Sequence, residues 1–188
     1  EFRRVLFRSL DDAVAVARSL VRKARRPVAL VSSWGSNEEL AALKAALGDR
    51  FEFVVKSDCQ AAPGEVVEDD LLIRADKNPN THGARALFGP APVGIAPDND
   101  LVIVWGEGFD FGKLPRGAKV VFLNSYLAPE NGHADVFLPI SIQTERAGHY
   151  TNFQGVVSRF EPCFPKGESV LDAEMLFKAL EAPPRGHT

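Results

Sequence analysis

Apolar residues recur at every third or fourth position over residues 10–24, a spacing that predicts an amphipathic helix. Ser9, followed by two aspartates, supplies a cap and first-turn acids, and basic residues gather at the other end, as the helix dipole favours. Residues 28–31 are then continuously apolar, which is typical of a strand buried on both faces of a parallel sheet. The chain is therefore predicted to open with a helix and a buried strand.

The following residues extend this pattern into a strand–helix–strand unit. Ser36 and Glu39 form a candidate capping box that opens a second helix, and Gly48 ends it. Residues 51–55 form the next strand, and the crossover between such parallel strands is right-handed in nearly all proteins. A short helix is predicted at 81–87. Three further apolar runs predict strands at 101–105, 120–123 and 136–138.

After Pro139 the sequence becomes polar and rich in glycine. A strand is predicted at 156–160, and a closing helix at 171–180. That helix is expected to pack through four apolar residues, Leu171, Met175, Leu176 and Leu180.

Together these elements predict an α/β fold, a Rossmann-like open and mostly parallel sheet of about five strands with flanking helices. Few helices connect the later strands, so one face of the sheet is expected to be thinly covered. Residues 10–140 form the Rossmann-like domain, and 141–188 are expected to be an extended segment and closing helix of the same domain. Residues 1–9 are expected to be a foreign leader, because Glu1 and Phe2 are what a common cloning site encodes.

The charge and the hydrophobicity of the chain indicate which kinds of partner are not expected. The 22 basic and 25 acidic residues are interspersed, and the net charge is −3, which argues against a nucleic-acid partner. No apolar run approaches the roughly 20 residues that span a bilayer, so direct membrane insertion is not expected.

The chain shows no metal-binding spacing. Cys59 and Cys163 are far apart in the sequence and form no CxxC pair. The four histidines show neither HxxxH nor HExxH spacing; they are His82, His133, His149 and His187. No metal ligand is therefore assigned, and both cysteines are interpreted as buried or idle thiols.

Two glycines after a predicted strand partly match a dinucleotide fingerprint. Gly106 and Gly108 are followed by Gly112, but that third glycine is one place late, and Pro115 interrupts the helix that would bind phosphate. The segment is therefore predicted to be a tight loop after the strand.

Other polar residues receive structural interpretations. Three serines in a strand-to-helix turn do not form a nucleophile elbow; they are Ser32, Ser33 and Ser36. Four acids beside the third strand are interpreted as solvated loop residues; they are Asp98, Asp100, Glu107 and Asp110. Residues 76–83 are interpreted as a rigid turn into a short helix that Thr81 caps. No catalytic, cofactor-binding or metal residue is assigned.

Several segments nevertheless resemble one family. Residues 134–139, followed by Glu145, Gly148, Thr151-Asn152 and Gly155, resemble the strand-plus-TN signature of molybdopterin oxidoreductases, and residues 33–39 resemble their helix start. Residues 72–80 resemble the large iron–sulfur subunit of bacterial NADH-quinone oxidoreductase, also called complex I. The resemblance spans roughly residues 10–180.

This resemblance implies a non-catalytic scaffold portion of a large subunit that takes part in electron transfer from NADH to quinone coupled to proton translocation. Iron–sulfur clusters are expected in a missing N-terminal part of that subunit, and none in this chain. The implied partners are that part and other peripheral-arm subunits, at the inner, cytoplasmic face of the bacterial membrane. Family positions that differ here, including Gln154, Val156 and Ser158, leave no pterin contact to assign.

Two alternatives stay open. One is a fragment of a molybdenum bis-pterin enzyme such as formate dehydrogenase, in which loops after the strands hold the cofactor. The other is a free-standing nucleotide-binding module. Under the favoured interpretation, residues 144–160 are expected to be a mobile interaction hook with Tyr150, Phe153 and Phe160 as its exposed aromatic anchors.

Overall fold

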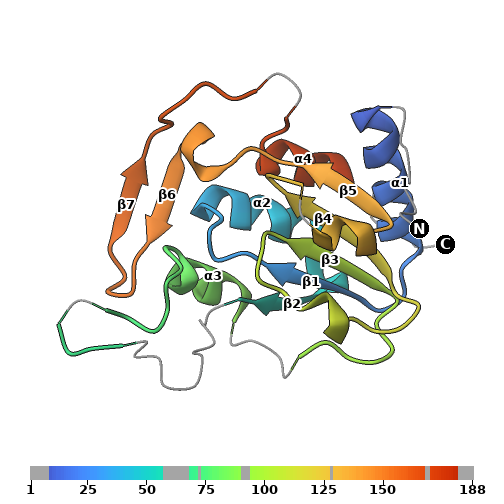
Figure 1. Cartoon of the computed structure of the whole chain (residues 1–188), viewed down its shortest axis with the longest axis horizontal. Coiled ribbons are helices and arrows are strands. Elements are labelled where there is room, and N and C mark those ends of the chain that lie inside the picture. The colour runs from blue at the N-terminus through green and yellow to red at the C-terminus, as the bar shows by residue number, and fades with distance from the viewer. Residues whose placement is uncertain are drawn as a thin grey trace.

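Figure 1 shows the chain as a computed structural model, which describes residues 9–56, 68–71, 73–89, 94–127, 129–167 and 170–181. Its centre is a five-stranded sheet in which every pair of neighbouring strands is parallel. The strand order is β2-β1-β3-β4-β5. The strands are β1 (Pro27–Val31), β2 (Glu52–Val55), β3 (Leu101–Trp105), β4 (Lys119–Asn124) and β5 (Val136–Pro139). The predicted α/β, Rossmann-like open sheet is confirmed.

Helices and one hairpin complete the described structure. The α-helices are α1 (Leu10–Lys23), α2 (Asn37–Leu47), α3 (Thr81–Phe88) and α4 (Ala173–Leu180). A separate antiparallel pair consists of β6 (Gly148–Thr151) and the predicted strand β7 (Val157–Phe160). Strand β6 was not predicted, because Gly148 and the polar residues after it form no apolar alternation. Short 3₁₀ turns lie at η1 (Gly48–Arg50), η2 (Phe111–Lys113), η3 (Pro129–His133) and η4 (Gln143–Glu145).

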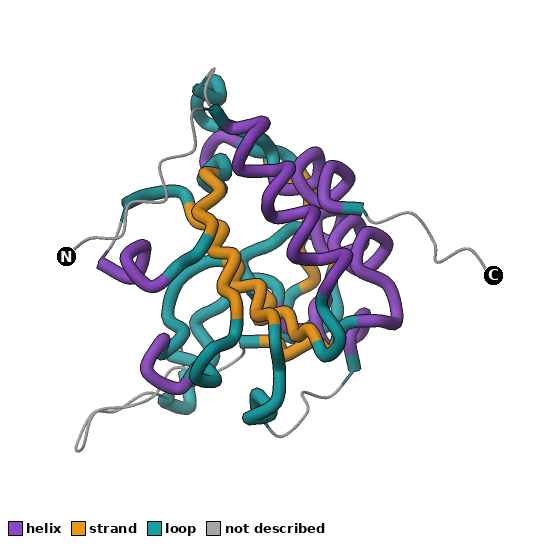
Figure 2. Tube along the Cα trace, turned by 90° about the vertical axis from the view of Figure 1, so that its right-hand side faces the viewer, coloured by secondary structure: helices purple, strands orange, loops and turns teal. Residues whose placement is uncertain are grey.

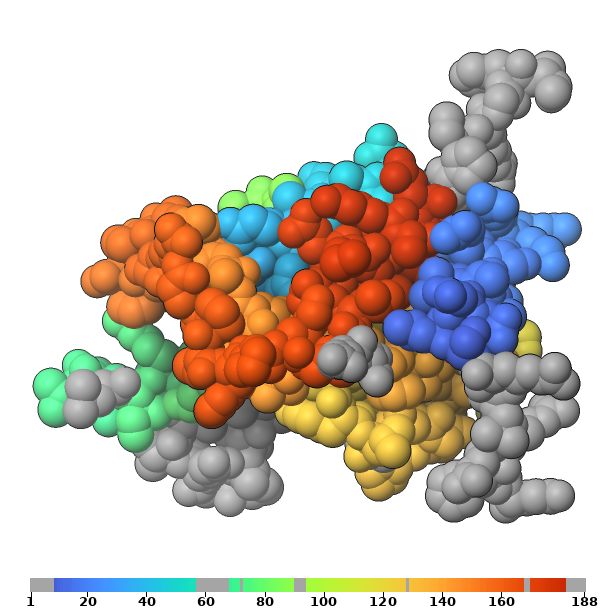
Figure 3. All heavy atoms as spheres, turned by 90° about the horizontal axis from the view of Figure 1, so that it is seen from above, coloured from blue at the N-terminus to red at the C-terminus, as the bar shows by residue number. Residues whose placement is uncertain are grey.

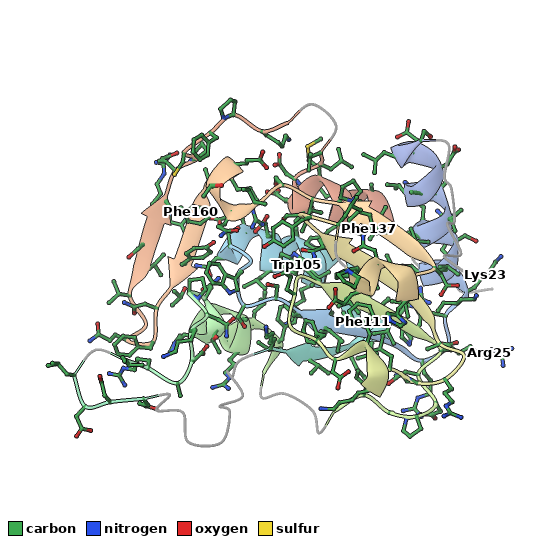
Figure 4. All side chains as sticks on the ribbon, viewed as in Figure 1. Lys23, Arg25, Trp105, Phe111, Phe137 and Phe160 are labelled. Carbon is green, nitrogen blue, oxygen red and sulfur yellow. The ribbon has the colours of Figure 1, made fainter. Side chains whose placement is uncertain are left out.

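The two faces of the sheet are covered differently, as expected. Side chains alternate along each strand, so Ile103 packs under the long helices while Val102 and Val104 face the other way. Figure 2 shows the long helices gathered on one side of the strands and mostly loops on the other. On the loop side, Phe111 contacts Phe122 with ring centroids 5.1 Å apart, and Phe137 lies 5.9 Å from Phe122 (Figure 4). On this face, aromatic side chains thus cover the sheet where a second layer of helices would otherwise pack.

The predicted cap of α1 and both predicted ends of α2 are confirmed. Ser9 Oγ accepts a hydrogen bond from Asp12 N at 3.1 Å, which caps α1. Ser36 and Glu39 form the reciprocal capping box of α2, because each side chain accepts from the backbone of the other residue. Gly48 then adopts a φ of 61°, which glycine tolerates without steric cost.

The closing helix differs from the prediction in its start and its buried face. It begins at Ala173, and Leu171 instead forms an isolated parallel bridge with Ile140. Met175, expected in the core, is 56% exposed, whereas Phe177 is fully buried. Met175 lies on the outer face because positions 173, 176, 177 and 180 are the ones that pack against the helix layer.

The prediction that Thr81 caps the short helix is wrong. Asn80 occupies the N-cap position of α3 and makes no side-chain cap, because its side chain bonds to other segments. The hydroxyl of Thr81 is buried without a hydrogen-bond partner.

No helix among the described residues is long and apolar enough to cross a membrane. Several sequence interpretations fall outside the described residues: those for the leader up to residue 8, for Cys59, for Leu72 and for His187. Cys163 lies within them and is an exposed free thiol, not a buried one.

Candidate functional site

The carboxyl edge of the sheet contains a crevice at its topological switch point. From β1 the chain proceeds to β2 on one side, and β3 then pairs with β1 on the other side. Loops diverge at such a point, and open α/β sheets commonly bind ligands there. The crevice has a volume of about 280 Å³, and its lining includes Ser32 after β1, Gly106 after β3 and Asn124 at the end of β4.

Polar groups in this crevice are bonded to one another. Lys56 Nζ donates to the backbone oxygen of Glu107 at 3.0 Å, and Asn124 Nδ2 lies 3.5 Å from Glu107 Oε1. The Ser33 hydroxyl donates to the backbone oxygen of Lys56, and Ser32 Oγ accepts from Trp34 N at 3.2 Å. These hydroxyls thus serve the turn, as the sequence interpretation held.

Trp105 fills the space beneath the turn that follows β1. Trp105, labelled in Figure 4, is 2% exposed, and its ring meets that of Phe177 edge-on at a centroid distance of 4.9 Å. A Cβ atom added to Gly35 would lie 2.2 Å from the Trp105 ring, so only glycine fits there. The floor of the crevice is therefore a packed aromatic wall rather than an open pocket.

The loop after β3 is the predicted tight turn. Gly106 and Gly108 have φ values of 83° and 79°, which favour glycine. The chain then enters the single turn η2 and not a phosphate-binding α-helix.

The four acids beside β3 lie at its two ends and do not form one group. Glu107 and Asp110 follow the carboxyl end of β3, whereas Asp98 and Asp100 precede its amino end. Asp100 accepts hydrogen bonds from the backbone N–H groups of Arg25 and Arg26 at 2.8 and 3.0 Å. Burial opposes the charged form of Asp100, but these two bonds outweigh it and hold its pKa below the ordinary value.

A second polar assembly lies at the start of α2, and we call it the α2 junction: Asn37, Glu38, Glu39, Asn80, Arg146, His149 and Thr151. Asn80 is fully buried and bonds to three segments. Its amide nitrogen donates to Gly35 O at 2.8 Å and to Asn37 Oδ1 at 3.0 Å, and its oxygen accepts from Thr151 N at 2.7 Å. Asn37 Nδ2 in turn donates to Thr151 Oγ1 at 3.0 Å.

The α2 junction also contains a buried ion pair. Arg146 Nη1 lies 2.5 Å from Glu39 Oε1, and the two side chains are 9% and 7% exposed. Arg146 additionally donates to Ile142 O at 3.1 Å, and Glu39 accepts from Ser36 N. Each charge is therefore paired and hydrogen-bonded, the condition under which burial of an ion pair is tolerated.

Strand β6 docks on this assembly through polar contacts. His149 N and Nδ1 contact the two oxygens of Glu38 at 3.0 and 2.5 Å. Burial would raise the pKa of Glu38, but the hydrogen bonds from His149 outweigh this effect and lower it.

The neighbouring residue of β6, Tyr150, packs inward. Its hydroxyl donates to Trp34 O at 3.1 Å, and its ring stacks on Phe160 at 4.4 Å. Burial raises the pKa of Tyr150, although the charge of Arg146 opposes the shift. Tyr150 and Phe160 are half-buried and stack on each other, so neither is the exposed anchor that the hook prediction required, whereas Phe153 is 61% exposed, as predicted.

The described residues bring together no group of three or more His, Cys, Asp or Glu side chains able to hold a metal ion. His82, His133 and His149 lie on three different elements, α3, η3 and β6. That no metal, cofactor or catalytic residue belongs to this chain stays a prediction.

The α2 junction was not predicted from the sequence because its residues come from three segments that are more than 40 positions apart. Two glycines were the available signal. A Cβ atom on Gly83 would lie 2.4 Å from Asn80 Oδ1, and one on Gly148 would lie 2.6 Å from Ser36 Cβ. Close approach of this kind accounts for glycine at both positions. Glu145, one of the residues on which the family resemblance rests, accepts a hydrogen bond from Ile142 N within its own turn and is not part of the α2 junction.

No protein-family model matches the chain, and no curated protein sequence matches it either.

Proposed function

We propose that this chain is a non-catalytic scaffold portion of the large molybdopterin-type subunit of an NADH:quinone oxidoreductase. The observation behind the proposal is the α2 junction. The three segments whose residues resemble that family, 33–39, 72–80 and 134–155, contribute Asn37, Asn80 and Thr151 to one hydrogen-bonded assembly. Chance matches in three separate segments would not be expected to lie together in the fold. Because these three segments do meet, their contact supports the resemblance to this family.

The state of the crevice supports a scaffold role rather than a catalytic one. Its volume of about 280 Å³ lies below the range of typical ligand sites, which is roughly 300–1,000 Å³. Lys56 and Arg146, the two cations in its lining, already contact Glu107 O and Glu39. The proposed role is to support redox centres in the missing N-terminal part of the subunit, alongside other peripheral-arm subunits at the inner face of the membrane.

The test is to tag the chain at its chromosomal locus and purify the protein that contains it from solubilised membranes. We expect NADH:quinone oxidoreductase activity, iron in excess of one atom per subunit and no stoichiometric molybdenum. Asn80→Ala should lower the amount of assembled complex but leave the activity per assembled complex unchanged, because Asn80 ties segments together and touches no redox centre. Glu174→Gln, at an exposed position on α4, is the control.

A second candidate is a portion of a molybdenum bis-pterin enzyme such as formate dehydrogenase. The location of the crevice, unlike its small volume, favours this candidate, because the crevice lies at the switch point where open α/β sheets bind ligands and is lined by polar groups. In the same purification this candidate predicts stoichiometric molybdenum, and an upstream cysteine or selenocysteine ligand in the gene. Recovery of a small protein with neither iron nor molybdenum would contradict both candidates and leave the nucleotide-binding module.

A further inference from the structure

The β6–β7 hairpin has two edges, and its hydrogen-bond ladder determines which groups lie on each. Asn152 N donates to Val156 O at 3.0 Å, so this pair is a hydrogen-bonded one. Bonded and non-bonded pairs alternate in an antiparallel ladder, and Thr151 pairs with Val157 while His149 pairs with Arg159. The backbone groups of His149 and Thr151 therefore point away from β7, and those of Val157 and Arg159 point away from β6.

Side chains close the edge of β6. His149 N donates to Glu38 Oε2 at 3.0 Å, and Thr151 N donates to Asn80 Oδ1 at 2.7 Å. Both outward N–H groups of β6 are thus satisfied by the α2 junction, so no further strand can add on this side.

The edge of β7 is open. Among the described residues no group bonds the outward backbone N–H of Val157 or Arg159. In Figure 1 β7 lies at the outer margin of the molecule, and Figure 3 shows the hairpin projecting beside the segment that precedes α3. Phe153, Val156 and Val157 are 61%, 52% and 58% exposed next to this edge. An open edge flanked by apolar side chains is a template for strand addition.

The side chains of β7 indicate the chemistry of the added strand. Val157 and Arg159 are two residues apart, so both lie on the same face of the hairpin. The Arg159 side chain is 68% exposed, and its ion pair among the described residues is with Glu161, whose side chain is 59% exposed. Arg74 adds a second cation over the Phe153 ring at 4.3 Å. A complementary strand would place an aliphatic residue against Val157 and an acidic one against Arg159.

We propose that β7 binds an extended strand of a partner protein that carries an aliphatic and an acidic residue two positions apart, so that both lie on the face of Val157 and Arg159. A second copy of this chain is the alternative occupant, and its pairing would depend on protein concentration. This proposal does not depend on the function proposed above. In the predicted hook the binding groups were aromatic side chains, including Tyr150 and Phe160, whereas here the binding group is the open backbone edge of β7.

The test uses a short synthetic peptide that repeats valine-threonine-glutamate-threonine as the probe, because this repeat places valine and glutamate two positions apart on one face. Backbone amide hydrogen exchange is followed for the whole chain with and without saturating peptide. We expect the amides of Val157 and Arg159 to exchange freely alone and to become protected with the peptide. A matched peptide with lysine in place of glutamate should bind about threefold more weakly, the scale of one exposed ion pair.

Two variants make the test specific. Val157→Pro removes an outward N–H group and should abolish the peptide-dependent protection, while continued protection of the Thr151 amide reports that the hairpin is still docked. Arg159→Glu leaves the backbone edge intact and should reverse the preference between the two peptides. Failure of the peptide to protect Val157 and Arg159, or an unchanged preference in Arg159→Glu, would overturn the proposal. Protection that grows with protein concentration in the absence of peptide would overturn it in favour of self-pairing.

Discussion

At the scale of single residues, the molecule uses polar side chains to join segments that no ladder connects. Asn80 does so with neutral hydrogen bonds, and Arg146 with a charge that is almost fully buried against Glu39. Neutral amides cost little when every donor and acceptor is matched, whereas a buried charge depends entirely on its partner. Among the residues of the α2 junction, Arg146 is therefore the one whose replacement should lower the free energy of unfolding most.

Replacement of Arg146 by Met is expected to lower the free energy of unfolding by about 3 kcal/mol, because the carboxylate of Glu39 would stay buried without its partner. Adding Glu39→Gln to this variant should recover part of the loss, since no charge is then buried. Urea denaturation measures both changes. Arg159→Met is the matched control: the ion pair of Arg159 is exposed on both sides, so its loss should cost under about 1 kcal/mol. Equal costs for Arg146→Met and Arg159→Met would contradict the assignment of a buried pair.

At the scale of elements, α4 shows how one helix face is chosen. Its buried residues are Ala173, Leu176, Phe177 and Leu180, and the helix packs against α1 and α2 (Figure 1). Phe177 also supports the Trp105 ring under the crevice. The helix therefore connects the helix layer to the floor of the candidate site.

Phe177→Ala is expected to cost about 3–5 kcal/mol of stability, because it removes a fully buried ring and leaves a cavity beside Trp105. The fluorescence of Trp105 should change in the same variant. Met175→Ala in the same helix provides the control, and as an exposed substitution it should stay within about 0.5 kcal/mol. Comparable losses for both variants would mean that α4 buries a different face.

The secondary structure was largely predictable because it depends on local signals. Apolar runs identified all five sheet strands, and Ser9, Ser36 and Gly48 marked helix ends. Strand β6 was not predictable, since its backbone is satisfied by Glu38 and Asn80, which are distant in sequence. The α2 junction was hidden for the same reason, because sequence spacing predicts neighbours on one element but not which side chains from three distant segments will meet.

At the scale of the whole molecule, acid stability reflects carboxylates that bind backbone N–H groups. Asp100 joins the turn after α1 to the start of β3 in this way. Its pKa is lower in the folded chain than in the unfolded chain. The resulting stabilisation is fully present above the unfolded pKa and is lost as the pH falls through the folded pKa.

Asp100→Asn is accordingly expected to lower stability by about 1 kcal/mol at neutral pH, because an amide accepts less strongly than a carboxylate. The difference from the unchanged chain should shrink as the pH falls below the ordinary range of an aspartate. Thermal unfolding across that range measures the slope. Asp98→Asn, whose carboxylate contacts only the exposed side chain of Arg26, should alter the slope little. A pH profile unchanged by Asp100→Asn would refute the role of Asp100.

The position of α4 in the chain also has a consequence for biosynthesis. This helix follows every strand in sequence, yet it packs between α1 and α2, which precede nearly all of them (Figure 1). While the chain is being synthesised, the apolar faces of α1 and α2 therefore stay uncovered until residues 173–180 have left the ribosome. Contacts between such distant segments form slowly, and uncovered apolar surface attracts chaperones or other nascent chains. The domain should consequently complete its fold only after translation of α4, and ribosome-bound chains that stop before residue 173 should remain sensitive to protease.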